Sequence, residues 1–294
     1  MRQILVLSGK GGTGKTTLAS ALIGIHQAKA FADCDVDAPN LHLTVGKMPE
    51  PIEHDFMGDQ KAVIDQDKCS ACGYCKTDCR FDAVDFDNGV YTINTIACEG
   101  CAVCTIRCPQ EAITMVDDVA GVLTLYKNTH TFSTAKLKMG RGNSGKLVTA
   151  VKQQLVMNTD LNIELAFIDG SPGIGCPVIA SVTGVDDVLM VVEPSLSGFS
   201  DFKRLMETIY QFRIHPMVCV NKYNIAQAQA DMIEQYCADH AIDFLGKIPY
   251  DTMVSKAINE GKNLSEVDGP AHQAILTIDQ KMMACIKEQN QTRK

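Results

Sequence analysis

The stretch SGKGGTGKTT, residues 8–17, determines how the rest of this 294-residue chain is interpreted. It contains the pattern G-x-x-x-x-G-K-[ST], which is matched by Gly9, Gly14, Lys15 and Thr16. An apolar run precedes the loop and a helix-compatible segment follows it, which is the context that this pattern requires. Glycines let backbone N–H groups wrap phosphates, and the start of a helix adds its positive end. The stretch therefore predicts a phosphate-binding loop.

Within this loop, each residue type has a chemical role. Lys15 should reach the β- and γ-phosphates of a nucleotide, and the Thr16 hydroxyl should contact Mg²⁺. The expected nucleotide-binding residues of the loop are Gly9, Gly11, Gly12, Thr13, Gly14, Lys15, Thr16 and Thr17.

The remaining apolar runs predict an α/β fold. Short runs rich in β-branched residues occupy 165–170, 187–194, 216–222 and 243–249, and a helix-length segment follows each of them. Repeated strand–helix alternation predicts a parallel sheet covered on both faces. With 46% hydrophobic residues, the chain can bury a large core.

The alternation stops between about residues 47 and 142, where cysteine, aspartate and glycine concentrate. Residues 65–118 hold ten acidic and four basic residues, so 10 − 4 gives this segment a charge of −6. Long insertions into surface loops cost little closure entropy. We therefore expect a P-loop domain in two parts, residues 1–58 and 119–294, interrupted by an inserted domain of residues 59–118. Residues 122–140 are expected to form a β-hairpin.

The insertion contains an internal repeat. CSACGYCKTDCRFDAV, residues 69–84, aligns with CEGCAVCTIRCPQEAI, residues 98–113, and the alignment matches four cysteines and an alanine. Each copy has the spacing C-x-x-C-x-x-C-x-x-x-C of bacterial two-cluster ferredoxins, in which the fourth cysteine binds the other copy's cluster.

This spacing predicts two [4Fe–4S] clusters. The expected ligands are Cys69, Cys72, Cys75 and Cys108 for the first cluster, and Cys98, Cys101, Cys104 and Cys79 for the second. The alternative is two zinc sites, which favour paired C-x-x-C motifs with longer spacers.

A second lysine, Lys10, lies inside the glycine loop, and with it GKGGTGKTT resembles the deviant Walker A motif of the MinD, Mrp and nitrogenase iron protein branch of P-loop ATPases. This resemblance implies that Lys10 reaches across a homodimer to the partner's nucleotide. The alternative is a solvated loop lysine.

Three further segments resemble the same branch. FADCDVDAPNL, residues 31–41, is similar to switch I, which implies that Asp35 assists the attacking water and makes Asp33 and Asp37 candidate partners in the Mg²⁺ shell. IDGSPGIG, residues 168–175, is similar to the Walker B and switch II segment, with Asp169 holding Mg²⁺ through water. The resemblance of VNKYN and GKIPYD to adenine-side loops implies that Asn221, Lys222 and Pro249 lie near the base.

Taken whole, the chain resembles the MinD-superfamily ATPases that contain an inserted dicluster ferredoxin domain. This resemblance implies a homodimer that hydrolyses MgATP and couples turnover to electron transfer through two clusters to an unknown partner. The alternatives are a maturation factor that delivers iron–sulfur or another metal, and a MinD-like spatial organiser.

Cys176 bears on the delivery alternative. It follows Asp169 at the offset where the nitrogenase iron protein carries a bridging-cluster ligand, which makes it a candidate labile metal site. The other interpretation is a packing cysteine, which we also expect for Cys34, Cys219, Cys237 and Cys285.

The overall charge of −8 and the pI near 5.4 argue against a nucleic-acid partner and favour a redox or metalloprotein client with a basic docking surface. The absence of an export signal, a membrane-spanning stretch and a disulfide-type cysteine pattern leads us to expect a cytoplasmic protein without a membrane partner. Residues 271–294 are expected to form a core-packing helix rather than a membrane-binding one.

Overall fold

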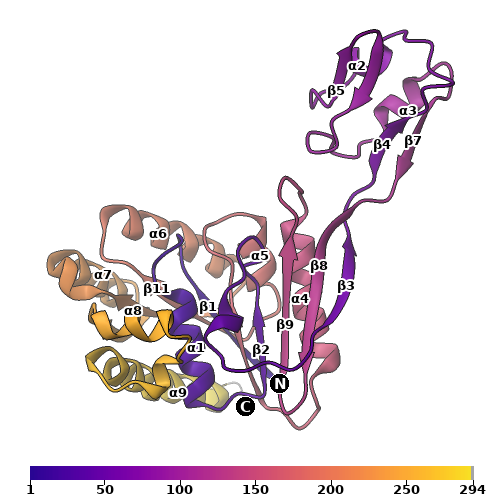
Figure 1. The fold of residues 1–294 in the computed structure, drawn as a ribbon. Coiled ribbons are helices and arrows are strands. Elements are labelled where there is room, and N and C mark those ends of the chain that lie inside the picture. Colours follow the sequence, from indigo (N-terminus) through magenta and orange to yellow (C-terminus); the bar gives the residue numbers. More distant parts are fainter. Residues whose placement is uncertain (293–294) are drawn as a thin grey trace. The chain divides into compact units, whose positions relative to one another are not determined.

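The chain divides into two compact units (Figure 1). The computed structural model describes residues 1–292, so the polar end of the expected C-terminal helix at 293–294 lies outside the described residues. The first unit comprises Met1–Glu53, Leu123–Lys136 and Gly145–Lys294, and the second comprises His54–Val122 and Leu137–Ser144.

A nine-stranded sheet has the order β13-β12-β11-β1-β10-β2-β9-β8-β3. Its strands are β1 (Arg2–Leu7), β2 (Ala30–Asp33), β3 (Ile52–Met57), β8 (Val119–Lys127), β9 (Thr131–Leu137), β10 (Leu165–Asp169), β11 (Asp187–Val192), β12 (His215–Asn221) and β13 (Asp243–Ile248). Every pairing from β13 through to β9 is parallel. The predicted parallel sheet is thus confirmed, and β8 and β9 are neighbours where a hairpin was expected.

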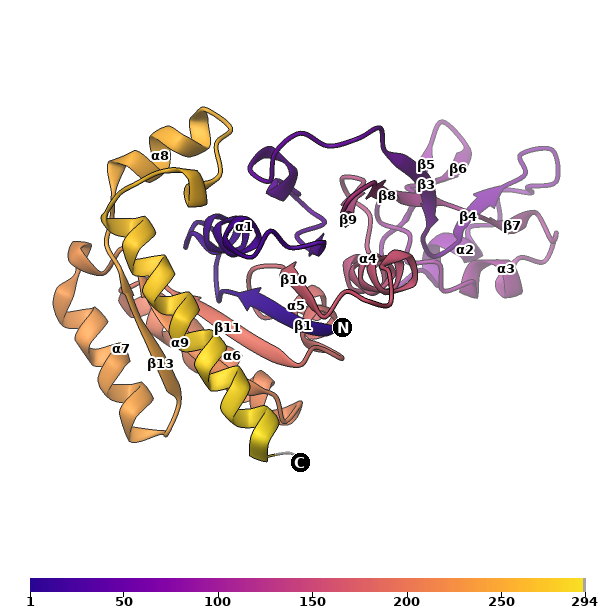
Figure 2. The ribbon, with the colours of Figure 1, turned by 90° about the horizontal axis from the view of Figure 1, so that it is seen from below.

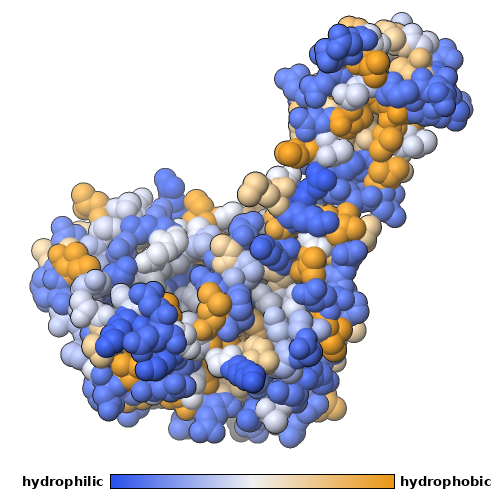
Figure 3. Space-filling view, viewed as in Figure 1, coloured by the Kyte–Doolittle hydropathy of each residue, from blue (hydrophilic) through white to orange (hydrophobic). Residues whose placement is uncertain are grey.

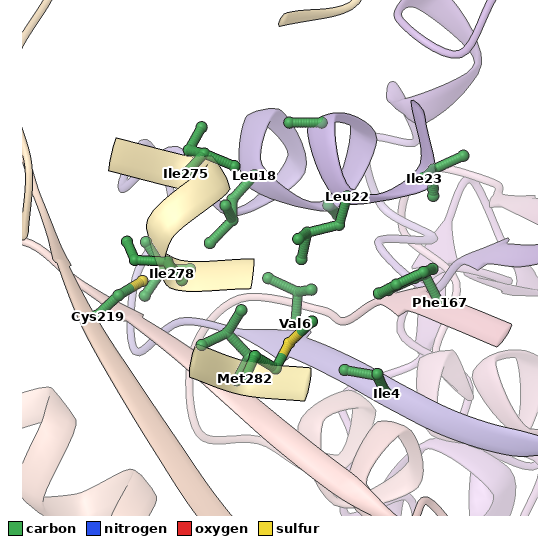
Figure 4. Packing of buried hydrophobic residues seen from close by; sticks show 14 of the residues in the cluster. Ile4, Val6, Leu18, Leu22, Ile23, Phe167, Cys219, Ile275, Ile278 and Met282 are labelled. Atoms are coloured by element: carbon green, nitrogen blue, oxygen red, sulfur yellow. The ribbon is translucent and has the colours of Figure 1, made fainter. Parts of the chain in front are cut away.

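Helices follow β1, β9, β10, β11, β12 and β13 along the chain. They are α1 (Lys15–Ile25), α4 (Ser144–Asn158), α5 (Cys176–Val182), α6 (Leu196–Gln211), α7 (Gln227–Asp239), α8 (Thr252–Asn259) and α9 (Pro270–Thr292). On β1, Ile4 and Val6 belong to the apolar cluster formed with α1 and α9 (Figure 4). Leu5 and Leu7 alternate with them and are also fully buried, so the sheet is covered on both faces.

The C-terminal helix α9 packs into this core, as predicted. Its buried residues Ile275, Ile278, Met282 and Ile286 follow one helix face. α9 lies alongside β13, the edge strand of the sheet (Figure 2). Within the described chain, no helix is both long and apolar enough to cross a bilayer.

The second unit is a structural repeat. Its elements are β4 (Lys61–Ile64), α2 (Tyr74–Thr77), β5 (Val84–Asp87), β6 (Val90–Ile93), α3 (Val103–Arg107) and β7 (Ile113–Val116). Adding 29 to the residue numbers converts β4 into β6, the start of α2 into the start of α3, and β5 into β7. The antiparallel pairs β4–β7 and β5–β6 have matching registers, so the repeat read from the cysteines is confirmed in the backbone.

The repeat extends to unusual backbone conformations. Positive φ angles occur at the equivalent pairs Ala71 and Gly100, Gly73 and Ala102, and Asp82 and Glu111. A residue other than glycine pays a conformational cost in this left-handed region. Because both copies adopt it at the same three positions, the loop geometry is imposed by the motif rather than by local residue preference.

The ion pair between Arg2 and Asp187 generates a stability prediction. Asp187 is fully buried, and Arg2 donates to its two carboxylate oxygens at 2.5 and 2.9 Å. We expect Arg2→Met to lower the free energy of unfolding by about 3–5 kcal/mol, because it removes the partner of a buried carboxylate. Urea unfolding checks this, with Lys262→Met in the exposed Lys262–Glu260 pair as the control that leaves stability nearly unchanged.

Candidate nucleotide site and cysteine repeat

The glycine loop between β1 and α1 is held by side chains that follow β12. Gly14 has a φ of 90°, and a Cβ there would lie 2.3 Å from the Asn221 amide nitrogen, so only glycine fits. Asn221 donates to the Thr13 carbonyl at 2.7 Å, and Lys222 donates to the Gly12 carbonyl at 2.9 Å. Asn221 and Lys222, predicted as base contacts, therefore fasten the loop backbone in this structure.

Asp169 at the end of β10 joins the two functional side chains of the loop. Its carboxylate lies 2.6 Å from Lys15 Nζ and accepts a hydrogen bond from Thr16 Oγ1 at 2.6 Å. Burial, the largest influence, lowers the pKa of Lys15, but the neighbouring carboxylates, Asp169 first, outweigh it and leave the pKa raised. The loop thus holds a charged lysine and a hydroxyl where phosphate and Mg²⁺ are expected.

The carboxylates that follow β2 have different surroundings. Asp33 is fully buried and accepts hydrogen bonds from the backbone N–H groups of Asp35, Asn40 and Leu41 at 2.9–3.0 Å. Burial, with a further contribution from the Asp169 charge, raises the pKa of Asp33 to about 7. Asp33 therefore organises the loop that presents Asp35.

Asp35 and Asp37 differ in exposure. Asp35 is half-buried, and burial raises the pKa of its carboxyl. Asp37 is exposed and does not line the adjoining cavity, whereas Asp35 does.

A cavity of about 350 Å³ opens above the glycine loop, within the range of small-molecule sites. Of the predicted nucleotide-binding residues, all but Gly9 line it, together with Lys10 and Asp35. Gly9 instead packs against α6, where a Cβ would lie 2.6 Å from that of Asp201. Sequence reasoning missed the apolar wall, which comprises Tyr250, Val254, Ile258, Leu264 and Ile275. The apolar spacing in α8 and α9 was the available signal.

Lys10 makes contacts within its own chain. Its Nζ lies 2.6 Å from a Glu193 carboxylate oxygen and 3.3 Å from each of the hydroxyls of Ser195 and Ser197 at the start of α6. The side chain is about one-third exposed. The ion pair with Glu193, which sequence reasoning missed, gives Lys10 a defined position rather than that of a freely solvated loop lysine.

The segment after Asp169 leads into α5, and Lys152 holds the end of that helix. From α4, Lys152 Nζ donates to the carbonyl oxygens of Ala180, Ser181 and Thr183. Burial lowers the pKa of Lys152 to about 8. Sequence reasoning did not identify this lysine, because nothing in its neighbours predicts that an ammonium caps a distant helix.

The cysteines of the second unit surround two cavities. The first is lined by Cys69, Cys72, Cys75 and Cys108, and the second by Cys79, Cys98, Cys101 and Cys104. Each fourth cysteine therefore comes from the opposite copy. The backbone N–H groups of Ala112 and Ala83 donate to the sulfurs of Cys108 and Cys79 at 3.3 and 3.4 Å, again at equivalent positions.

These cavities do not resemble single-ion sites. Among the described residues, no three His, Cys, Asp or Glu side chains converge closely enough to hold one metal ion. The sulfurs surround a space instead of meeting at a point, so the zinc alternative gains nothing from this geometry. The two-cluster assignment itself stays a prediction.

The remaining cysteines fall into two groups. Cys34, Cys219 and Cys237 are buried and Cys285 is half-buried, which agrees with the expected packing role. Cys176 is exposed at the first residue of α5, which gives no support to the alternative of a semi-buried packing cysteine.

A glycine loop between β1 and α1, a lysine and threonine bonded to a strand-end aspartate, and a cavity above them on a parallel sheet define a P-loop nucleotide-binding protein. The family of the CobQ/CobB/MinD/ParA nucleotide-binding domain matches residues 4–264, and the chain belongs to this family.

The chain is similar to three further proteins. It is 30% identical over 286 residues to the uncharacterized protein MJ0578 of Methanocaldococcus jannaschii, covering 95% of this chain and 96% of that one. The septum site-determining protein MinD of Pyrococcus horikoshii, solved with Mg-ADP, has the same fold, with a TM-score of 0.56, 17% identity, and coverage of 97% and 98%. A match of 57 residues, 37% identical and spanning 19% of this chain and 66% of the other, links it to pyruvate synthase subunit PorD of M. jannaschii.

The raised pKa of Asp33 predicts a pH dependence of stability. The folded state keeps Asp33 protonated up to about pH 7, whereas the unfolded chain ionises it near the ordinary aspartate pKa of 3.8. The folded state therefore binds more protons between these values, and stability from this group falls as the pH rises through them. From pH 5 to pH 8, we expect wild type to lose about 2–3 kcal/mol relative to Asp33→Asn.

Urea unfolding of both proteins at the two pH values measures this difference. Asp37→Asn, an exposed carboxylate of the same loop, is the matched control and should follow wild type. Parallel pH profiles for wild type and Asp33→Asn would contradict the interpretation.

Proposed function

We propose that this chain is an ATPase that works as a homodimer and couples MgATP hydrolysis to electron transfer through two [4Fe–4S] clusters to a partner protein. The observation that carries the proposal is the presence in one chain of a glycine-loop cavity and two cavities lined by four cysteines each. Family membership supports nucleotide binding and hydrolysis.

The residues of the glycine-loop cavity suit MgATP. Lys15 is a charged donor beside the loop amides, and Thr16 and Asp169 are oxygen donors of the kind that Mg²⁺ prefers. Lys15 exchanges its bond to Asp169 for the phosphates, and Asp169 is then free to orient the shell of the ion. Mg²⁺ supplies charge neutralisation at the phosphates. Asp35, which borders the cavity, orients the attacking water.

Lys10 is the residue that makes hydrolysis depend on the dimer. In the single chain, Glu193 and the hydroxyls of Ser195 and Ser197 hold it. Dimer closure exchanges these contacts for the partner's nucleotide, where an added positive charge stabilises the transferring phosphoryl group. Glu193 therefore serves as the resting partner of Lys10. Members of the MinD/ParA family commonly dimerise, which supports this proposal.

The two cysteine sets suit cubane clusters. Each set places four thiolates around one cavity, and each contains three sulfurs from one loop and one from the opposite copy. The backbone N–H groups of Ala83 and Ala112 donate to the fourth sulfurs, and such hydrogen bonds stabilise a thiolate bound to iron. The clusters supply one-electron chemistry. The match to a pyruvate synthase subunit has about the length of residues 59–118, which suits a module that recurs in other proteins.

The surface of the second unit suits a basic partner. Residues 65–118 carry the charge of −6, and the large apolar residues Ile96 and Ile106 are 63% and 84% exposed. Apolar residues lie interspersed among hydrophilic ones on the face seen in Figure 3. Acidic charge steers a basic redox protein, and isolated apolar contacts then stabilise the encounter.

Exposure of Cys176 favours a second candidate function, the delivery of iron–sulfur or another metal to a client protein. One Cys176 from each protomer would supply two accessible thiolates at the start of α5. This function requires Cys176, whereas electron transfer through the two clusters does not.

Mixing two inactive variants tests the action of Lys10 in trans. We expect Lys10→Ala and Asp35→Ala each to lose ATP hydrolysis, because each removes a residue that every site needs. An unsorted mixture of the two variants should regain about a quarter of the wild-type rate, since random pairing makes about half of the dimers mixed and each of these holds one intact site of two. A mixture as inactive as its parents, with dimers shown by sedimentation, would mean that Lys10 acts within its own chain.

Iron content and redox titration test the coupling. Anaerobic protein should contain about eight irons per chain, and a non-hydrolysable MgATP analogue should shift the cluster potentials measured by electron paramagnetic resonance. The Lys15→Ala variant is the matched control, because it keeps the clusters and loses the nucleotide response. Potentials that ignore nucleotide, together with loss of client activation in Cys176→Ser, would favour metal delivery instead.

A further inference from the structure

The two halves of the second unit are related closely enough for their differences to be informative. Corresponding residues differ by 29 in number, so Lys61 at the start of β4 corresponds to Val90 at the start of β6. Lys61 is buried with 8% exposure, whereas Val90 is 42% exposed. A buried lysine therefore occurs in one half only at this position, and it breaks the symmetry between the two cysteine sets.

Lys61 lies against the second cysteine set. Its Nζ donates a hydrogen bond to the carbonyl oxygen of Cys98. The adjoining loop is packed just as tightly, because the Gln60 carbonyl leaves no room for a side chain at Gly100. Cys98 is itself buried, while its counterpart Cys69 is partly exposed. The ammonium is thus fixed beside the backbone of Cys98, a predicted ligand of the second cluster, in a buried position.

A buried positive charge raises the reduction potential of a nearby cluster. Reduction adds one negative charge to the cluster, and a fixed ammonium stabilises that charge more strongly in a low-dielectric interior than at a surface. The hydrogen bond to the Cys98 carbonyl holds the charge in place. The same stabilisation is missing at Val90, so the first cluster gains nothing equivalent.

Other groups near the second cluster act less strongly. Glu99 lines the second cavity, Asp59 lies beside Gly100, and Asp85 and Asp87 lie on β5, but all four are exposed, so water and salt screen their charges. At the first cavity, Tyr91 and Gln110 are polar but uncharged. The dipoles of these two side chains stabilise the reduced first cluster. A full buried charge stabilises the reduced second cluster more strongly.

We propose that Lys61 makes the cluster of Cys98, Cys101, Cys104 and Cys79 the one with the higher reduction potential, so that electrons pass from the cluster of Cys69, Cys72, Cys75 and Cys108 to it. This inference rests on the proposed two-cluster function. In the step, the reduced first cluster loses one electron and the oxidised second cluster gains it, without a change in protonation. The second cluster is therefore the terminal electron site within the chain, and it is the one that should donate to the partner.

An anaerobic redox titration followed by electron paramagnetic resonance tests this order on the full chain. The wild-type potentials should differ by at least about 59 mV, which is a tenfold equilibrium preference for one electron. Lys61→Met should lower the higher potential by a similar amount, about 59 mV or more, and leave the lower potential nearly unchanged. Lys61→Arg, which keeps the charge, should resemble wild type. Lys61→Gln keeps a hydrogen-bond donor without the charge, and serves if the methionine variant folds poorly.

Two controls make the result specific. Lys76→Met removes an exposed lysine beside Cys75 and should move neither potential appreciably. Cys101→Ser and Cys72→Ser, at equivalent exposed ligands, assign the two signals, and only Cys101→Ser should perturb the higher-potential one. Charge-removing variants at Lys61 that leave the higher potential in place, or that lower the other one, would overturn the inference. Iron well below about eight per chain would instead count against the two-cluster function itself.

Discussion

The carboxylate of Asp169 is the group on which the first unit depends. It is fully buried at the end of β10, a central strand, and both of its oxygens are engaged by Lys15 and Thr16. Taking a carboxylate and an ammonium out of water is costly unless the two are paired and hydrogen-bonded. The fold must therefore bring the ends of β1 and β10 together, and parallel pairing of these neighbouring strands does so. In the proposed function, a nucleotide with its metal ion would compete for the same two side chains, so ligand binding and the internal ion pair would be alternatives at one site.

Much of this arrangement could be predicted, because it follows from local patterns. Short sequence patterns identify the glycine loop, the strand that precedes it and the aspartate near the end of 165–170. Parallel pairing of the two strands then brings the loop and the aspartate together. The roles of Asn221, Lys222 and Glu193 could not be predicted in the same way. Their contacts with the loop or with Lys10 depend on how β12 and α6 approach it, and side chains distant in sequence meet there only after the sheet has formed.

In the second unit, the repeat could be predicted from the sequence, but a difference between its two copies could not. Cysteine spacing indicated the repeat, and the backbone follows it to the strand register and the left-handed positions. The burial of Lys61 could not be predicted, because lysine is seldom buried and its counterpart is a valine. Arguments from cysteine spacing compare only the positions that match between the two copies, so they do not detect such a difference. The position that does not match is the one that can distinguish two otherwise equivalent sites.

The nucleotide site and the second unit are joined by chain segments with defined contacts at each end. Lys152 of α4 holds the carbonyl end of α5, the helix that follows Asp169 in the chain. α4 begins three residues after Arg141, which contacts the Thr95 carbonyl and the Asp118 carboxylate within the second unit. A movement of α5 upon nucleotide binding must either break the contacts of Lys152, leaving a buried ammonium unpaired, or carry α4 with it. Because an unpaired buried ammonium is costly, the contacts of Lys152 tie α4 to α5 within the first unit.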